Sequence, residues 1–295
     1  MRSTGSLSLY AWSVVAAVAF PSHDSKGAEQ EPTPQAQRLS VTHPRPVGRA
    51  VHQFAEEYGY VITYEEPRWL YDGDLVDVTD KVRRTPWKPG DLRIFSPKSG
   101  TITVEYPLSA EGWPTDVRRV IDDVLRLDAE RIGERFKVLQ DGEDFHVVPI
   151  RTRDATGQWV AVTPILDTRI SIPVTRHYIG DYFLEICREL SKQTSQPIEA
   201  GSWPLKLFLG STTDGADDEI ARDVVMRLLR RFQQKLSWYL AYDASMKRYY
   251  FSVVSMGYRI GEVPPWTSLV PSSPNNRSPM ESRPANAMPG VRTTP

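Results

Sequence analysis

The sequence has little of what usually marks an enzyme, a metal protein or a nucleic-acid-binding protein. Cys187 is the only cysteine among 295 residues, which excludes an intramolecular disulfide and a zinc site built from cysteine thiolates. The formal net charge is −1, so no overall field attracts the chain to nucleic acid or to an anionic membrane. No H-E-x-x-H motif occurs, and we assign no catalytic residue, metal ligand or cofactor.

Long apolar runs are also scarce. Residues 7–20, "LSLYAWSVVAAVAF", form an uncharged apolar stretch that follows Arg2 and ends near the small residues Ala17 and Ala19. This stretch is too short for a transmembrane helix and has the pattern of a secretory signal. We therefore predict a signal peptide over residues 1–19, a periplasmic or secreted location, and no membrane insertion of the mature chain.

Polar, proline-containing segments stand at both ends of the remaining chain. Residues 20–40 are predicted to be a disordered tether, and residues 261–295 a disordered proline-rich tail. The folded part is thus expected between residues 41 and 260.

Four segments of this part carry apolar side chains at helical spacing. The predicted buried faces are Val47, Ala50, Val51, Phe54, Ala55 and Tyr58; Val117, Val120, Ile121, Val124 and Leu125; Ile179, Tyr182, Phe183, Ile186, Cys187 and Leu190; and Ala221, Val224, Val225, Leu228, Leu229 and Phe232. Acidic residues 214–219 precede the last of these helices, where they would complement the helix dipole. Cys187 is interpreted as a small buried hydrophobe.

Runs rich in aromatic and branched residues predict the strands. Strands are expected at residues 60–65, 101–108, 169–174 and 205–211, and hairpins at 136–150 and 236–254. The first hairpin turns at Asp141-Gly142, a pair that favours a tight turn.

The helices recur in matched register. A shift of 132 residues places the first helix on the third, with Gly48 on Gly180, and a shift of 104 places the second on the fourth. We therefore predict an α+β fold of two similar split βαβ-type units, at residues 41–151 and 169–260, joined by a connector at 152–168. Each unit has two amphipathic helices packed on one face of a small mixed sheet, and the opposite face is predicted to be free for a partner.

The first unit carries an insertion at residues 66–100. It contains Trp69, Tyr71, Asp72, Asp74 and Trp87, and a loop of this length with several aromatic residues is often functional. We predict that these five residues bind a partner. The alternative is a clasp in which the tryptophans only cover the edge of the sheet.

The chain resembles a known family in two places. These are "TITVEYPL", "DVRRVIDDVL" and "FKVLQDGEDFHVVPI" in the first unit, and "LKLFLG", "ARDVVMRLL" and "LSWYLAYDASMKRYYFSVV" in the second. Their order is similar to that of the short N-terminal (STN) domain of secretins and TonB-dependent receptors. The resemblance implies a periplasmic interaction module that docks onto other envelope proteins. No barrel or pore sequence follows, so we expect a free-standing, non-enzymatic binding protein with an envelope protein or complex as its partner.

Two other functions remain open. An enzyme acting on an envelope polymer would use Asp72, Asp74 or the pair Asp144 and His146, although we interpret that pair as a solvent-exposed part of a strand. A nucleic-acid-binding protein would use the basic ridge at residues 227–235, beside aromatic residues. Export and the neutral total charge disfavour nucleic acid as a partner.

Overall fold

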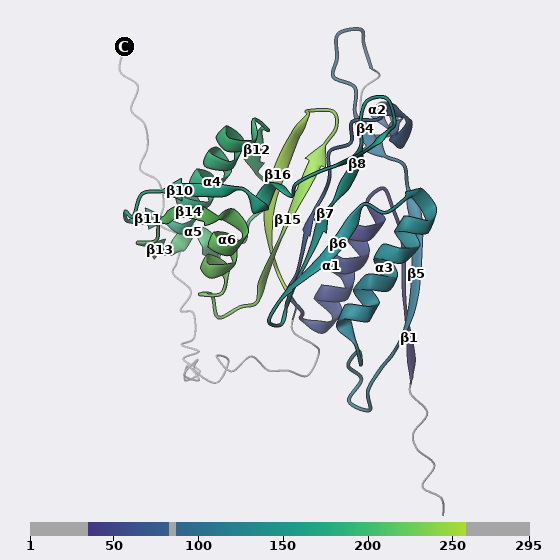
Figure 1. Cartoon of the computed structure of the whole chain (residues 1–295), viewed down its shortest axis with the longest axis horizontal. Coiled ribbons are helices and arrows are strands. Elements are labelled where there is room, and N and C mark those ends of the chain that lie inside the picture. The colour runs from purple at the N-terminus through teal and green to yellow at the C-terminus, as the bar shows by residue number, and fades with distance from the viewer. Residues whose placement is uncertain (1–34, 83–86, 258–295) are drawn as a thin grey trace, which may run out of the picture.

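The computed structural model describes residues 35–82 and 87–257 and has the predicted α+β fold with two similar units (Figure 1). The predicted signal peptide, the predicted tail and most of the predicted tether lie outside the described residues. Residues 36–40 already belong to a strand, so the prediction of a tether reaching residue 40 is wrong at that end. No helix of the described residues is both long and apolar enough to cross a bilayer.

Unit 1 runs from β1 to β7. Its main elements are β1 (Ala36–His43), α1 (Pro46–Tyr58), β2 (Ile62–Glu65), β5 (Gly100–Pro107), α3 (Val117–Ile132), β6 (Phe136–Asp141) and β7 (Asp144–Pro149). β2 pairs in parallel with β7, which pairs antiparallel with β6. β1 and β5 form a separate antiparallel pair that also contacts the helices.

Unit 2 runs from β10 to β16 and repeats this pairing. Its elements are β10 (Arg169–Ile172), β11 (His177–Tyr178), α4 (Ile179–Thr194), β12 (Ile198–Ala200), α5 (Lys206–Leu209), β13 (Ser211–Thr212), β14 (Ala216–Ile220), α6 (Ala221–Leu229), β15 (Leu236–Asp243) and β16 (Arg248–Ser255). β12 pairs in parallel with β16, β16 antiparallel with β15, and β10 antiparallel with β14.

Two local predictions in unit 2 are wrong. Residues 205–211 were expected to form a strand, but most of them form α5, which follows Pro204 and buries Leu207. The strand that pairs with β10 is instead the acidic β14, which was expected to be the start of a helix. Pairing of the backbone with β10 outweighs the low strand propensity of aspartate there.

The insertion and the connector are both folded. The insertion contains a 3₁₀ turn, η1 (Asp72–Asp74), then β3 (Leu75–Asp77), α2 (Thr79–Val82) and β4 (Phe95–Pro97), with β3 and β4 paired antiparallel. The connector contains the hairpin β8 (Arg151–Arg153) and β9 (Trp159–Ala161), followed by the 3₁₀ turn η2 (Ile165–Asp167).

Apolar stripes explain the helices, and their buried residues match the predicted faces closely. The six predicted residues of α1 and the six of α4 are all buried, as are five of the six predicted with α6. Gly48 in α1 and Gly180 in α4 each allow an aromatic ring against the helix, because a Cβ there would lie 2.8 Å from the Tyr64 ring or 2.7 Å from the Phe208 ring. The two glycines therefore have the same role in equivalent helices.

The units join through their sheets. β15 of unit 2 pairs in parallel with β2 of unit 1, which gives one six-stranded sheet in the order β12-β16-β15-β2-β7-β6. In this pairing Tyr239 lies beside Tyr64, and Leu240 lies beside Glu65. Tyr64 belongs to the core of α1 and α3, whereas Leu240 belongs to the core of α4 and α6.

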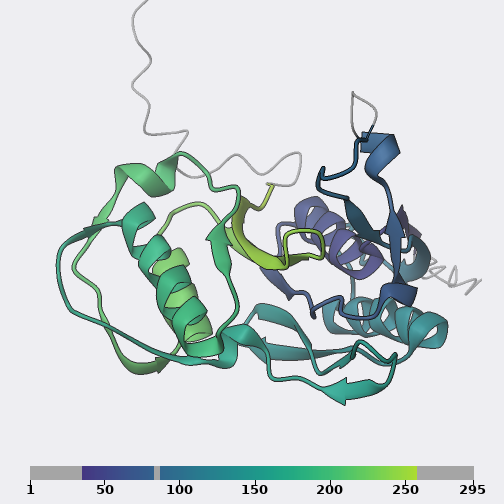
Figure 2. The same cartoon turned by 90° about the horizontal axis from the view of Figure 1, so that it is seen from above.

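The two helix pairs therefore cover opposite faces of the sheet, on either side of it in Figure 2. The prediction of a free sheet face is wrong for unit 1, because Thr63, Glu65, His146 and Val148 on that face are all buried. The connector and unit 2 supply part of this cover, since backbone groups of η2 bond Glu65 and Trp238 stacks beside His146. Relative to unit 1, unit 2 therefore has the corresponding strands running in the opposite direction and its helices on the other face of the sheet.

Candidate partner-binding surface

The base of the insertion is fixed by Trp69. Its partly buried ring packs against the unit 2 core and lies 4.7 Å from the guanidinium of Arg135. Arg135 is itself buried and donates to the carboxylate of Asp128 at 2.9 Å. Trp69 therefore packs the base of the insertion against the fold and has a structural role.

Tyr71 and Asp74 meet the connector hairpin. The Arg153 guanidinium lies between two rings, 5.7 Å from Tyr71 and 5.0 Å from Trp159, and forms a 3.0 Å ion pair with Asp74. Asp72 is exposed on η1 beside this group. The carboxylate of Asp74 thus has a structural partner, which removes it from the residues available for acid–base chemistry.

Trp87 lies in a different part of the insertion. Its indole N–H donates to the Asp91 carbonyl at 3.1 Å, and Arg93 lies 4.8 Å above its ring. The five residues predicted to bind a partner therefore do not form one site. Trp69, Tyr71 and Asp74 hold the base, Asp72 is exposed nearby, and Trp87 belongs to the outer part.

The outer part of the insertion exposes large apolar side chains, and we call it the insertion tip. It consists of Val76, Val82, Trp87, Leu92 and Phe95. Trp87 is half-buried, and the other four are exposed, Val82 by 57% and Leu92 by 53%. The tip is anchored at Phe95, whose N–H donates to Ser245 Oγ in the β15–β16 turn at 2.8 Å. Exposed apolar residues on a fixed element are typical of protein contact surfaces.

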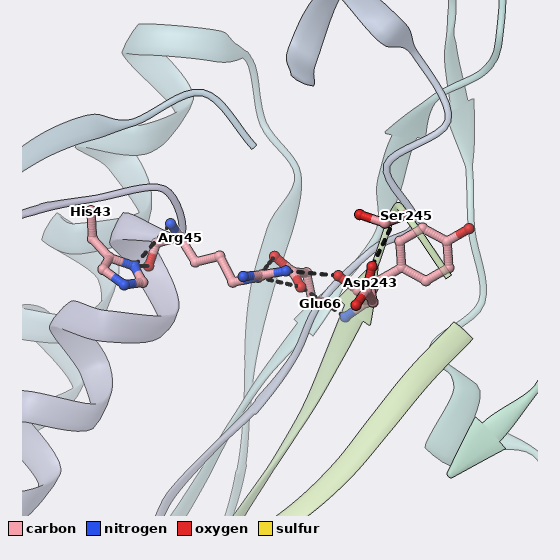
Figure 3. A network of polar contacts seen from close by, with 6 residues as sticks. His43, Arg45, Glu66, Asp243 and Ser245 are labelled. Atoms are coloured by element: carbon pink, nitrogen blue, oxygen red, sulfur yellow. Dashed lines mark hydrogen bonds and ion pairs between the residues drawn. The ribbon is translucent and has the colours of Figure 1, made fainter. Parts of the chain in front are cut away.

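An ion pair between Arg45 and Glu66 lies where the two units meet (Figure 3). Arg45 Nε donates to both oxygens of Glu66 at 2.9 Å, and Arg45 Nη2 donates to the Tyr242 carbonyl at 2.8 Å. The N–H of Tyr242 in turn donates to Glu66 at 2.8 Å. Attraction to Glu66 raises the pKa of Arg45. We call these three residues the junction clamp.

A groove adjoins the junction clamp on the α1 face of the sheet. His43, Arg45, Arg49, His52, Tyr64 and Tyr239 are among the residues that line it, and no carboxylate is among them. Arg49 is exposed. The positive charge of Arg45 is already balanced by Glu66, and His52 lies 3.3 Å from Glu56.

Asp144 and His146 do not form an acid–base pair open to substrate. His146 is buried, bonds Thr63 Oγ1 through Nδ1 at 2.8 Å, and stacks beside Trp238. Burial lowers the pKa of His146 to about 4, so the ring is neutral near pH 7. Asp144 forms a 2.7 Å ion pair with Arg230. The interpretation of His146 as solvent-exposed is wrong, because the join between the units covers that face.

Other ionisable groups of the described residues are likewise held in structural contacts. Glu65 is buried and accepts the N–H groups of Ile165 and Leu166, and burial raises its pKa to about 7. Burial raises the pKa of the Cys187 thiol to about 12, which leaves a poor nucleophile. No group of three or more potential metal ligands occurs in the described residues.

The basic ridge is neutralised by neighbouring carboxylates. Arg227 pairs with Glu219, Arg230 with Asp141 and Asp144, and Arg231 with Asp214. These pairs reduce the positive field that binding to nucleic acid phosphates requires.

Comparisons with known proteins returned no relative. No protein-family model matches the chain, and neither the search of curated proteins nor the search of solved structures found a match.

Proposed function

We propose that the protein is an exported, non-enzymatic binding protein of the cell envelope, built from duplicated STN-like modules. The repeated pairing of strands in the two units and the equivalent roles of Gly48 and Gly180 support the duplication. The structural use of Asp74, Asp144, His146 and Cys187 supports a binding role over a catalytic one.

The insertion tip is the observation that carries this proposal. Val76, Val82, Leu92 and Phe95 of the tip are exposed, although the base of the insertion is fixed through Trp69, Tyr71 and Asp74 and its outer part through the Phe95–Ser245 contact. Presenting side chains from an ordered element reduces the entropy that binding must overcome. We infer that the tip contacts an envelope protein.

Paired aspartate variants test this function. The variant V82D/L92D places two charges in the tip, whereas V174D/L205D places two charges at unit 2 positions that are 77% and 73% exposed. Each protein is immobilised and exposed to an envelope extract. We expect the tip variant to capture at most one tenth of the partner that the parent chain captures, and the control variant to capture as much as the parent. Equal capture by both variants, or turnover of an envelope polymer by the purified protein, would contradict the proposal.

The contacts of the described residues do not favour the two alternatives, an enzyme acting on an envelope polymer and a nucleic-acid-binding protein. Asp72 is exposed, and the carboxylate of Asp74 is paired with Arg153. The arginines of the basic ridge are likewise paired.

A further inference from the structure

The six-stranded sheet ends in β12 on one side and β6 on the other, and the two ends differ. In β12 the backbones of Pro197 and Gly201 face β16, because the Pro197 carbonyl accepts from Tyr249 and the Gly201 N–H donates to Phe251. Ile198 therefore faces outward. Ser191 Oγ closes this position, accepting from the Ile198 N–H at 2.9 Å and lying 3.3 Å from its carbonyl.

The β6 edge has no such cover among the described residues. The Phe145 N–H donates to Val61, so the backbone of Phe145 faces β2 and its neighbours in β7 face β6. The register then directs the backbones of Lys137, Leu139 and Asp141 toward β7. The N–H and carbonyl groups of Phe136, Val138 and Gln140 therefore point away from the sheet, and within residues 35–82 and 87–257 no other strand pairs with this edge.

We propose that β6 pairs antiparallel with β6 of a second copy of this chain, about a two-fold axis at Leu139. In this register Val138 and Gln140 exchange backbone hydrogen bonds with Gln140 and Val138 of the second copy, which uses the outward groups. The side chains of Lys137, Leu139 and Asp141 alternate onto one face. Leu139 then meets Leu139, and each Lys137 lies opposite an Asp141, so the charges are complementary.

Parallel pairing of β6 with β12 of a second copy is opposed by Ser191, which already bonds the outer edge of β12. Inside the chain, the outward edge of β15, which is the counterpart of β6, receives β2 in parallel. Within unit 2, β12 corresponds to β2, and Ser191 already bonds its outward-facing residue Ile198. Pairing of β6 with β6 is self-complementary, so it uses both β6 edges and stops at two copies, with the β12 edges, bonded at Ile198 by Ser191, at the two ends.

Contact through one short strand buries little surface, so the dimer is expected to be weak and to depend on concentration. Cysteine cross-linking of the full chain tests both its existence and its register. Cys187 is buried and does not compete. Under mild oxidation we expect L139C alone to form a disulfide dimer, because residues opposite each other lie within disulfide distance.

The proposed register also predicts which other cysteine variants cross-link. K137C and D141C should each cross-link at most one tenth as well as L139C when alone, and should form a mixed dimer when combined. Equal cross-linking of K137C alone, of D141C alone and of the mixture would overturn the register, and absence of an L139C dimer at millimolar protein would overturn the proposal.

Proline variants provide an independent measurement by analytical ultracentrifugation. Gln140 and Ala200 occupy outward-facing positions of β6 and β12, so proline removes no hydrogen bond within the sheet at either position. We expect Q140P to weaken dimerisation at least tenfold and A200P to leave it unchanged. An equal effect of both substitutions, or a monomeric parent chain at millimolar concentration, would overturn the pairing through β6.

Discussion

β2 and β12 occupy the same place in their units, yet their outward edges are satisfied in different ways. The Ile62 carbonyl of β2 accepts from Ser237, which belongs to the other unit, at 2.7 Å. The corresponding Ile198 of β12 is bonded by Ser191 from its own unit. α1 ends at Tyr58 before the left-handed Gly59, whereas α4 continues to Thr194 and so carries Ser191 over the strand. The length of one helix thus decides whether a strand edge is joined or closed.

The junction clamp is present only at the joined β2 edge, and its loss should give the largest change in the free energy of unfolding. In Arg45→Ala the fully buried Glu66 carboxylate loses its countercharge, which costs about 3–5 kcal/mol when a buried pair is broken. We expect urea unfolding to show this loss and to separate into two transitions. Arg118→Ala, which removes the exposed pair with Asp122, should cost less than about 1 kcal/mol. A single transition with equal losses for both variants would show that the clamp does not join the units.

The pH dependence sharpens the comparison, because two groups on the covered face of unit 1 titrate with opposite effects. The pKa of Glu65 is raised from 4.5 to about 7, so its contribution is complete below 4.5 and is lost as pH rises through 7. The pKa of His146 is lowered from 6.5 to about 4, so its contribution is complete above 6.5 and is lost as pH falls through 4. Each contribution is about 3 kcal/mol, and they oppose each other in the parent chain.

Single variants should therefore reveal opposite slopes. Between pH 4.5 and 6.5 we expect the free energy of unfolding of Glu65→Gln to rise with pH and that of His146→Phe to fall with pH, measured by urea titration. The parent chain should change less than either variant. Slopes of the same sign in the two variants would contradict the opposed titrations.

The two serines allow a direct comparison of the edges. Ser191→Ala leaves the Ile198 N–H without its hydroxyl partner, and Ser237→Ala leaves the Ile62 carbonyl without its own. Each loss should cost about 1–2 kcal/mol. We expect amide hydrogen exchange at Ile198 to accelerate only in Ser191→Ala, whereas Ser237→Ala should affect residues on both sides of the junction. Unchanged exchange at Ile198 in Ser191→Ala would show that the hydroxyl does not protect the edge.

The two equivalent glycines should give the smallest effects. Ala at Gly48 forces the buried Tyr64 ring to move, whereas Ala at Gly180 meets Phe208, which is 46% exposed and able to shift. Alanine also favours a helix by about 1 kcal/mol over glycine. We therefore expect Gly48→Ala to lower the free energy of unfolding by about 1 kcal/mol and Gly180→Ala to leave it unchanged or raise it. Thermal melting of both variants measures this difference. A lower melting temperature for Gly180→Ala than for Gly48→Ala would contradict the prediction.

Helices and hairpins were predictable because a single segment carries their signal. The stripe from Val47 to Tyr58 has helical spacing by itself, and Asp141-Gly142 specifies a turn without reference to the rest of the chain. β14 was not predictable in this way, because its strand conformation depends on pairing with β10. The wrong strand at residues 205–211 arose because a short apolar run has no periodicity that separates it from a helix.

The join between the units lay beyond sequence reasoning, because backbone groups make most of it. One feature of the sequence indicates the join, namely the consecutive acidic residues Glu65 and Glu66 at the end of an apolar strand. Such acids require partners if they are buried, and Arg45 and the η2 backbone supply them here. The sequence indicates an insertion at residues 66–100, but the division between its base and its tip depends on contacts with Arg135, Arg153 and Ser245.

The pairing of β2 with β15 also has a consequence for how the chain matures. Ser237 and Ile62 bond across 175 positions, so a growing polypeptide completes all of unit 1 long before the neighbour of β2 has been synthesised. During that interval the β2 edge must wait without its final partner, and such long-range closure is slow. The last hairpin to emerge is therefore the step that seals the first half of the molecule.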